Sequence, residues 1–133
     1  MMSQSLMILV AGPYRSGTGD NPAKLAANVA AMESVAWALY QQGLMPVLGE
    51  WLALPMLRLA GSHGPGDVLW DAHFHPHAER LLAHCDGVLR IGGPSRGADR
   101  MVAVAQQLGK PVFQTLEAVP AAGGYIQDAV EPL

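Results

Sequence analysis

The chain has 133 residues, of which half are hydrophobic and 14% are charged, a composition typical of one globular domain with a single core. A formal net charge of −3 and the lack of any lysine- and arginine-rich run argue against a protein that binds the nucleic-acid backbone. The single cysteine, Cys85, excludes an internal disulfide and fits a reducing compartment. No apolar run reaches the roughly 20 residues that span a bilayer, and the start lacks the features of a signal peptide, so we expect a soluble, cytoplasmic protein.

The first third of the chain predicts a buried strand followed by a long helix. The uninterrupted apolar run over 6–11 is typical of a strand that is buried on both faces, as in a parallel sheet. A loop rich in glycine, serine and threonine follows over 12–20. Asn21-Pro22 then offers a helix N-cap followed by proline at the first helical position. Apolar residues at three- and four-residue steps predict a helix over 23–42.

The middle of the chain predicts a short strand and two helices. Residues 45–49 favour a strand that ends in a loop over 49–51, and a helix is expected over 52–60. The segment 68–85 is helical in pattern, and Pro76 is expected to break or kink it.

The last third predicts two more strands and one helix. A strand over 88–91 leads into a turn of small residues over 92–97, and an amphipathic pattern predicts a helix over 98–108. A final strand is expected over 112–116, and the tail at 117–133 shows no strong period. Strands that alternate with helices in this way predict a single domain, an open parallel α/β sheet of four to five strands with helices on both faces.

Polar side chains follow three of the predicted strands, where ligands bind in such sheets. The loop after the first strand contains Tyr14 and Arg15, an aromatic ring that can stack on a base and a charged donor. The loop after the second strand brings the carboxylate of Glu50. The loop after the third strand, 92–99, is a candidate phosphate site. Together these loops predict a nucleotide pocket at one edge of the sheet.

The candidate phosphate site is the run Gly93-Pro94-Ser95-Arg96-Gly97. Its small residues leave backbone N–H groups uncovered, and the helix that follows points its positive end at the same place. The alternative is that these glycines only turn the chain tightly, since neither glycine-rich loop matches a known phosphate-binding signature. Both interpretations stay open on the sequence.

Two carboxylates, Glu50 and Asp99, are the candidate catalytic groups. As alternatives, Glu50 is a surface carboxylate in contact with water, and Asp99 only stabilises the first turn of a helix. Ser95 fits the pattern Gly-x-Ser-x-Gly of serine hydrolases literally, but the preceding proline and the length of the chain argue against a nucleophilic serine.

Three histidines alternate along the chain at His73, His75 and His77. On a strand they would share one face and could bind zinc. On the predicted helix only His73 and His77 lie one turn apart, and Pro76 disturbs either geometry. We therefore expect no metal site, and a segment exposed to water.

Five short motifs follow one another along residues 6–116. They are Val10–Arg15, Val47–Glu50, Cys85–Leu89, Pro94–Gly97 and Leu108–Val112. With this order and spacing the chain resembles the nucleoside 2-deoxyribosyltransferase-like superfamily, which includes the 2'-deoxynucleoside 5'-monophosphate N-glycosidases. The resemblance implies a flavodoxin-like fold, and homodimers in which the partner helps to complete each site.

The resemblance also implies an activity and its residues. The activity is cleavage or transfer at the N-glycosidic bond of a nucleoside or nucleotide. The 5'-phosphate or hydroxyl end would be held by Ser95 and Gly97, and the base and phosphate would contact the loop Gly12-Pro13-Tyr14-Arg15. We expect a small-molecule ligand, no cofactor, and neither a nucleic-acid polymer nor a membrane as partner.

Two positions depart from the pattern of the catalytic relatives. Met101 occupies the position of the glutamate that acts at the anomeric carbon, and Ala78 occupies the position of an aspartate that contacts the sugar or base. Glu50 or Asp99 would then supply the acidic group that an oxocarbenium-like transition state needs. Two hypotheses follow: an N-glycosidase or transferase with a substituted carboxylate, or a module that senses a nucleotide, or serves a structural role, without catalysis.

Overall fold

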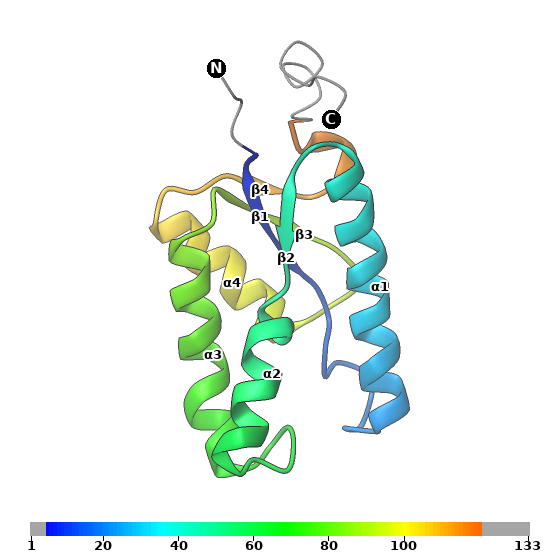
Figure 1. The fold of residues 1–133 in the computed structure, drawn as a ribbon, viewed down its shortest axis with the longest axis vertical. Coiled ribbons are helices and arrows are strands. Elements are labelled where there is room, and N and C mark those ends of the chain that lie inside the picture. Colours follow the sequence, from blue (N-terminus) through cyan, green and yellow to red (C-terminus); the bar gives the residue numbers. More distant parts are fainter. Residues whose placement is uncertain (1–4, 121–133) are drawn as a thin grey trace.

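Four parallel strands form the centre of the structure, a computed structural model that describes residues 5–120. The strands are β1 (Met7–Ala11), β2 (Met45–Val47), β3 (Gly87–Arg90) and β4 (Val112–Phe113), in the spatial order β2-β1-β3-β4. β1 pairs with β2 on one side and with β3 on the other, so the direction of the connections reverses at β1. This is the open parallel, flavodoxin-like or Rossmann-like sheet that was expected, with four strands among the described residues (Figure 1).

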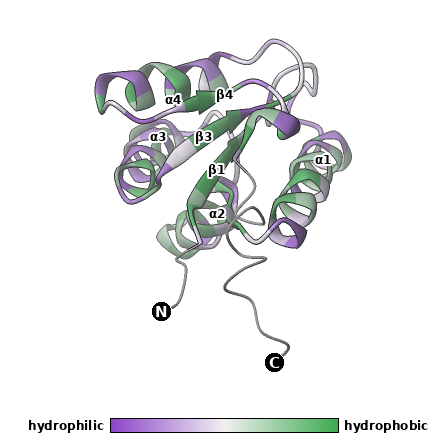
Figure 2. Cartoon of the chain, turned by 90° about the horizontal axis from the view of Figure 1, so that it is seen from above, coloured by the Kyte–Doolittle hydropathy of each residue, from purple (hydrophilic) through white to green (hydrophobic). Residues whose placement is uncertain are grey.

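Helices cover both faces of the sheet (Figure 2). They are α1 (Pro22–Gln41), α2 (Gly49–Ala60), α3 (Val68–Ala83), α4 (Arg96–Gln107) and a 3-10 turn, η1 (Leu116–Ala118). α1 lies on one face, and α3 and α4 lie on the other. α2 packs against α3 and extends beyond the carboxyl end of the sheet (Figure 1). None of the described helices is both long and apolar enough to cross a membrane.

The side chains of β1 alternate between two cores. Ile8 and Val10 pack with α1, whereas Leu9 and Ala11 pack with α3 and α4. All four are at most 5% exposed, which confirms the expected strand with both faces buried. Val119, just after η1, is 2% exposed and joins the α1 core, so that core extends past the last strand.

The prolines do not interrupt the helices. Pro76 was expected to break or kink the helix, but it lies inside the continuous α3, and Pro55 lies inside α2. Pro76 and Ala72, whose carbonyl loses its N–H partner to the proline, are both exposed. Water can therefore satisfy that carbonyl, and the packing of the opposite face keeps α3 intact.

The expected boundaries of α2 and β4 are wrong. Residues 49–51 were expected to form a loop, but they are the first turn of α2. The last strand is shorter than 112–116, because Thr115 caps η1 with its side chain, which accepts a hydrogen bond from the N–H of Ala118 at 3.2 Å. Most of the expected tail lies outside the described residues, which end at Pro120.

Candidate functional site

A cavity of about 680 Å³ opens at the carboxyl ends of β1 and β3, where the strand order reverses. Its walls come from the loop after β1, the start of α2, the middle of α3 and the start of α4. This position is the usual ligand site of open parallel sheets, and the volume falls in the range of about 300–1,000 Å³ that is common for small-molecule pockets.

The loops that follow β1 and β3 pack closely against each other beside the cavity. Gly92 has φ +78°, and a Cβ there would lie 2.6 Å from Cδ of Pro13. A Cβ at Gly12 would lie 3.0 Å from Cγ1 of Ile91. Glycine is therefore needed at 92 both for the backbone conformation and for the contact. Pro13 serves in this packing and does not line the cavity, whereas Gly12 does.

The anion-binding end of the cavity is the start of α4. Ser95 is the N-cap: it is 8% exposed, and its Oγ accepts a hydrogen bond from the N–H of Ala98 at 3.1 Å. Its own hydroxyl hydrogen remains available to donate. Arg96 and Gly97, expected in the turn, are the first two residues of the helix, where N–H groups have no partner within the helix. These donors and the helix dipole together suit an anion.

Three aromatic side chains form the opposite end, which we call the aromatic wall: Tyr14, Trp70 and Phe74. The ring centroids of Tyr14 and Trp70 are 5.7 Å apart with an interplanar angle of 16°, and those of Trp70 and Phe74 are 4.5 Å apart at 10°. The sequence indicated only Tyr14. Trp70 and Phe74 lie four residues apart on α3, and this spacing on one helix face was the signal that could have identified them.

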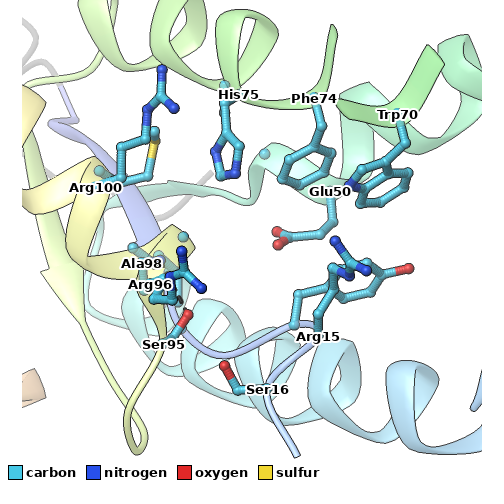
Figure 3. A pocket seen from close by; sticks show the side chains of 18 of the residues that line it. Arg15, Ser16, Glu50, Trp70, Phe74, His75, Ser95, Arg96, Ala98 and Arg100 are labelled. Carbon is cyan, nitrogen blue, oxygen red and sulfur yellow. Dashed lines mark hydrogen bonds between the residues drawn. The ribbon is translucent and has the colours of Figure 1, made fainter. Parts of the chain in front are cut away.

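Glu50 is the buried carboxylate of the cavity. It lies in the first turn of α2, is 8% exposed, and points into the space between the aromatic wall and Ser95 (Figure 3). Burial raises the pKa of Glu50 to about 7, although a hydrogen bond to its own backbone N–H acts in the opposite direction. Burial, and then the nearby Glu50, also raise the pKa of Tyr14. Glu50 is therefore a mixture of protonated and ionised forms near neutral pH.

The interpretation of Glu50 as a water-exposed carboxylate is wrong. α2 begins beside α3: a Cβ at Gly49 would lie at ordinary van der Waals distance, 3.5 Å, from Cβ of Ala78. Glu50, the next residue, is 8% exposed and lines the cavity. Ala78 and Met101 are themselves buried and line the cavity as an apolar surface. Met101 also belongs to the core between the sheet and α4, as its helical spacing indicates.

Asp99 lies apart from Glu50, in a separate and more open depression. Its side chain is 70% exposed, and its Oδ1 accepts a hydrogen bond from Nε of Arg90 at 3.1 Å. Gly93 and Pro94 line this second depression as well. Of the residues assigned to a site from the sequence, those that line the main cavity are Gly12, Tyr14, Arg15, Glu50, Ser95, Arg96 and Gly97.

Three arginines lie around the cavity (Figure 3). Arg15 donates to both carboxylate oxygens of Asp20, each at 3.0 Å, and Arg100 pairs with Glu79 at 2.6 Å. Among the ion pairs within residues 5–120, none involves Arg96. Arg96 is therefore the arginine that can pair with an anionic ligand without giving up a partner.

His75 is a cavity residue, although the segment of three histidines was expected to be exposed to water. Its ring packs edge-on against Phe74 at 5.5 Å, and a Cβ at Gly97 would lie 3.3 Å from its Cε1. Within the described part of the chain, no three histidine, cysteine, aspartate or glutamate side chains gather in a way that could hold a metal ion.

Comparison with known proteins adds no assignment: no protein-family model matches the chain, and no curated protein matches its sequence. The interpretation of the cavity therefore depends on its own chemistry.

Proposed function

We propose that the cavity binds a nucleoside or nucleoside 5'-monophosphate. The base would lie along the aromatic wall, where stacking is sequence-tolerant and contributes about 1–3 kcal/mol per base in other proteins. The phosphate would lie at the start of α4, held by the N–H groups of Arg96 and Gly97 and by Ser95. The wall and this helix start face each other across one cavity, which supports a ligand with an apolar ring at one end and an anion at the other.

We further propose that the protein cleaves the N-glycosidic bond of this ligand, with Glu50 as the proton donor. The observation that carries this proposal is a buried carboxylate with a pKa near 7, which points into the space between the two ends of the cavity. The glycosidic bond would lie there. A departing base needs a proton, and an acid whose pKa lies near the working pH donates one efficiently.

A second candidate is a module that binds the nucleotide without cleaving it. Ala78 and Met101 support this candidate, because the surface that they form carries no charged group. In either case, a nucleotide ligand and a single buried thiol fit a cytoplasmic location.

We also propose a homodimer, as the sequence resemblance implies. α2 supports it with an exposed apolar stripe, Leu52, Met56 and Leu59, of which Leu59 is 88% exposed. Sedimentation equilibrium checks this: Leu59→Glu should shift a dimer toward monomer, and a monomeric parent protein would contradict it.

The experiment that tests the proposed function combines two measurements. The protein is incubated at high concentration with deoxyribo- and ribonucleoside 5'-monophosphates, and free base is measured by chromatography. Thermal unfolding is followed with the same compounds, since a ligand at 100 times its Kd adds about 2.7 kcal/mol of stability. Base release supports the enzyme, a stability gain alone supports the binding module, and neither result with any nucleotide contradicts both.

A further inference from the structure

His75 reaches the cavity from α3 on the side opposite the loop of Arg15 and Ser16 (Figure 3). Its imidazole sits between the edge contact with Phe74 and the first turn of α4. At Gly97 the missing side chain makes room for it, since a Cβ would lie 3.3 Å from Cε1 of His75 and 3.9 Å from its Nε2. The imidazole therefore lies between the aromatic wall and the anion-binding end, as Glu50 does.

The imidazole also has unused hydrogen-bonding capacity. Its Nδ1 is buried and has no partner among residues 5–120. His77, which does not line the cavity, has the same buried Nδ1, so this nitrogen is not the one that meets a ligand. The nitrogen of His75 that lies beside Gly97, a residue that lines the cavity, is Nε2.

His75 is held in the neutral form. Burial, and next the positive charge of Arg100 on α4, lower the pKa of His75, and Arg15 acts in the same direction. Glu79 and Asp71 on α3 oppose this effect without cancelling it. A neutral imidazole carries one nitrogen that accepts a proton, whereas a histidine that bound phosphate through its charge would have to be protonated.

We propose that His75 is the general base of the reaction, so that the protein hydrolyses the N-glycosidic bond directly and does not transfer the sugar to another base. The proposal depends on the proposed function, and it concerns the two side chains that face the same space, Glu50 and His75. Met101 and Ala78 offer no nucleophile to hold the sugar covalently. Since Glu50 holds the proton for the departing base in this proposal, water is the group that attacks.

The step balances with these two groups alone. The oxygen of water forms a bond to the anomeric carbon while the bond from that carbon to the base nitrogen breaks. One water proton goes to the unprotonated imidazole nitrogen of His75, and the carboxyl proton of Glu50 goes to the departing base. The products are the free base and the sugar phosphate, and a proton passes back from His75 to Glu50 through solvent before the next turnover.

The test uses the full chain and His75→Asn, with His77→Asn as the matched control. His77 lies on the same helix and also has a buried Nδ1 with no partner in the described part of the chain, but it does not line the cavity. Each of the four 2'-deoxynucleoside 5'-monophosphates is incubated with its own free base in isotopically labelled form. The parent protein and both variants are compared in four measurements. These are the release of base, the incorporation of label into nucleotide, the Kd for nucleotide and the pH profile of kcat.

We expect base release without incorporation of label. His75→Asn should lower kcat by about 100-fold or more, the usual effect of a general base, change Kd by less than about threefold, and remove the acid limb of the pH profile. His77→Asn should behave as the parent protein does.

Incorporation of label, an effect of His75→Asn on Kd instead of kcat, or an equal loss in His77→Asn would overturn the inference and leave the proposed cleavage intact. Nucleotide that binds and is never cleaved would overturn the inference together with the proposed cleavage.

Discussion

Glu50 and Asp99 occupy equivalent places in the fold and have opposite surroundings. Each lies in the first turn of a helix that follows a parallel strand. Glu50 is 8% exposed, and its pKa is raised to about 7 by burial. Asp99 is 70% exposed at its side chain and pairs with Arg90. The difference shows that location at a strand end does not by itself raise the pKa of a carboxyl group, whereas burial does.

The largest expected effect follows directly from this contrast. Glu50→Gln keeps the shape of the side chain and removes its proton, so base release should fall by about 100- to 10,000-fold while nucleotide binding persists. Steady-state kinetics with a binding measurement by calorimetry checks it. Base release that survives in this variant would show that the buried carboxylate is not the acid.

The burial of Glu50 also predicts how stability depends on pH. The folded protein holds the Glu50 proton up to a pKa of about 7, whereas the unfolded chain releases it near 4.5. The stabilisation is fully present below pH 4.5 and is lost as pH rises through about 7, a change of about 3 kcal/mol.

Urea unfolding from pH 4 to 8.5 measures this change. Relative to the parent protein, Glu50→Gln should gain stability across that range as pH rises. Parallel curves for the two proteins would contradict the burial of an uncompensated carboxylate.

The aromatic wall is the next difference between the main cavity and the depression around Asp99. None of the residues that line that depression within the described part of the chain is aromatic. Tyr14→Leu should weaken nucleotide binding by about 5- to 150-fold, because one stacked ring contributes about 1–3 kcal/mol. Tyr40→Leu is the matched control: Tyr40 is 60% exposed on α1, stacked on Trp37 and outside the cavity. Equal binding in the two variants would exclude the wall as the base site.

The smallest effect is expected at Asp99. Asp99→Asn removes the exposed carboxylate of the ion pair with Arg90, whose own side chain is 11% exposed and also donates to the carbonyls of Ile91 and Gly93. Because the carboxylate is in contact with water and Arg90 keeps these acceptors, the loss should be at most about 1 kcal/mol. The free energy of unfolding in urea should change by less than about 1 kcal/mol. The rate of base release should change by less than about threefold. A loss of activity as large as that in Glu50→Gln would remove the distinction between the two carboxylates.

The sequence predicted the sheet because its signals are local. The apolar run over 6–11 and the helix start at Asn21-Pro22 are read from neighbouring residues, and both lie where they were expected. The start of α2 was missed because its N-cap, Leu48, has no side chain that can cap a helix. The continuity of α3 through Pro76 depends on tertiary packing, which no local pattern shows.

The candidate site was predictable only in part, because much of it depends on tertiary packing that local sequence signals do not show. Parallel strands bring their carboxyl ends to one edge, so Tyr14 and Ser95 were expected to face one pocket, and they do. Glu50 is buried where the start of α2 packs beside α3, and His75 lies against Gly97, where a Cβ would come within 3.3 Å of its Cε1. These contacts join residues far apart in the chain, and their spacing gave no indication of them.

Cys85 gives the molecule a practical property. It is the only cysteine in the sequence and is 1% exposed, and burial raises the pKa of its thiol to about 11. Thiol reagents react with the thiolate, which is scarce at such a site near neutral pH. A cysteine introduced at exposed Ser16, on the rim of the cavity, would therefore accept a fluorophore selectively in the native chain. Such a label would report ligand entry without removal of any native residue of the core.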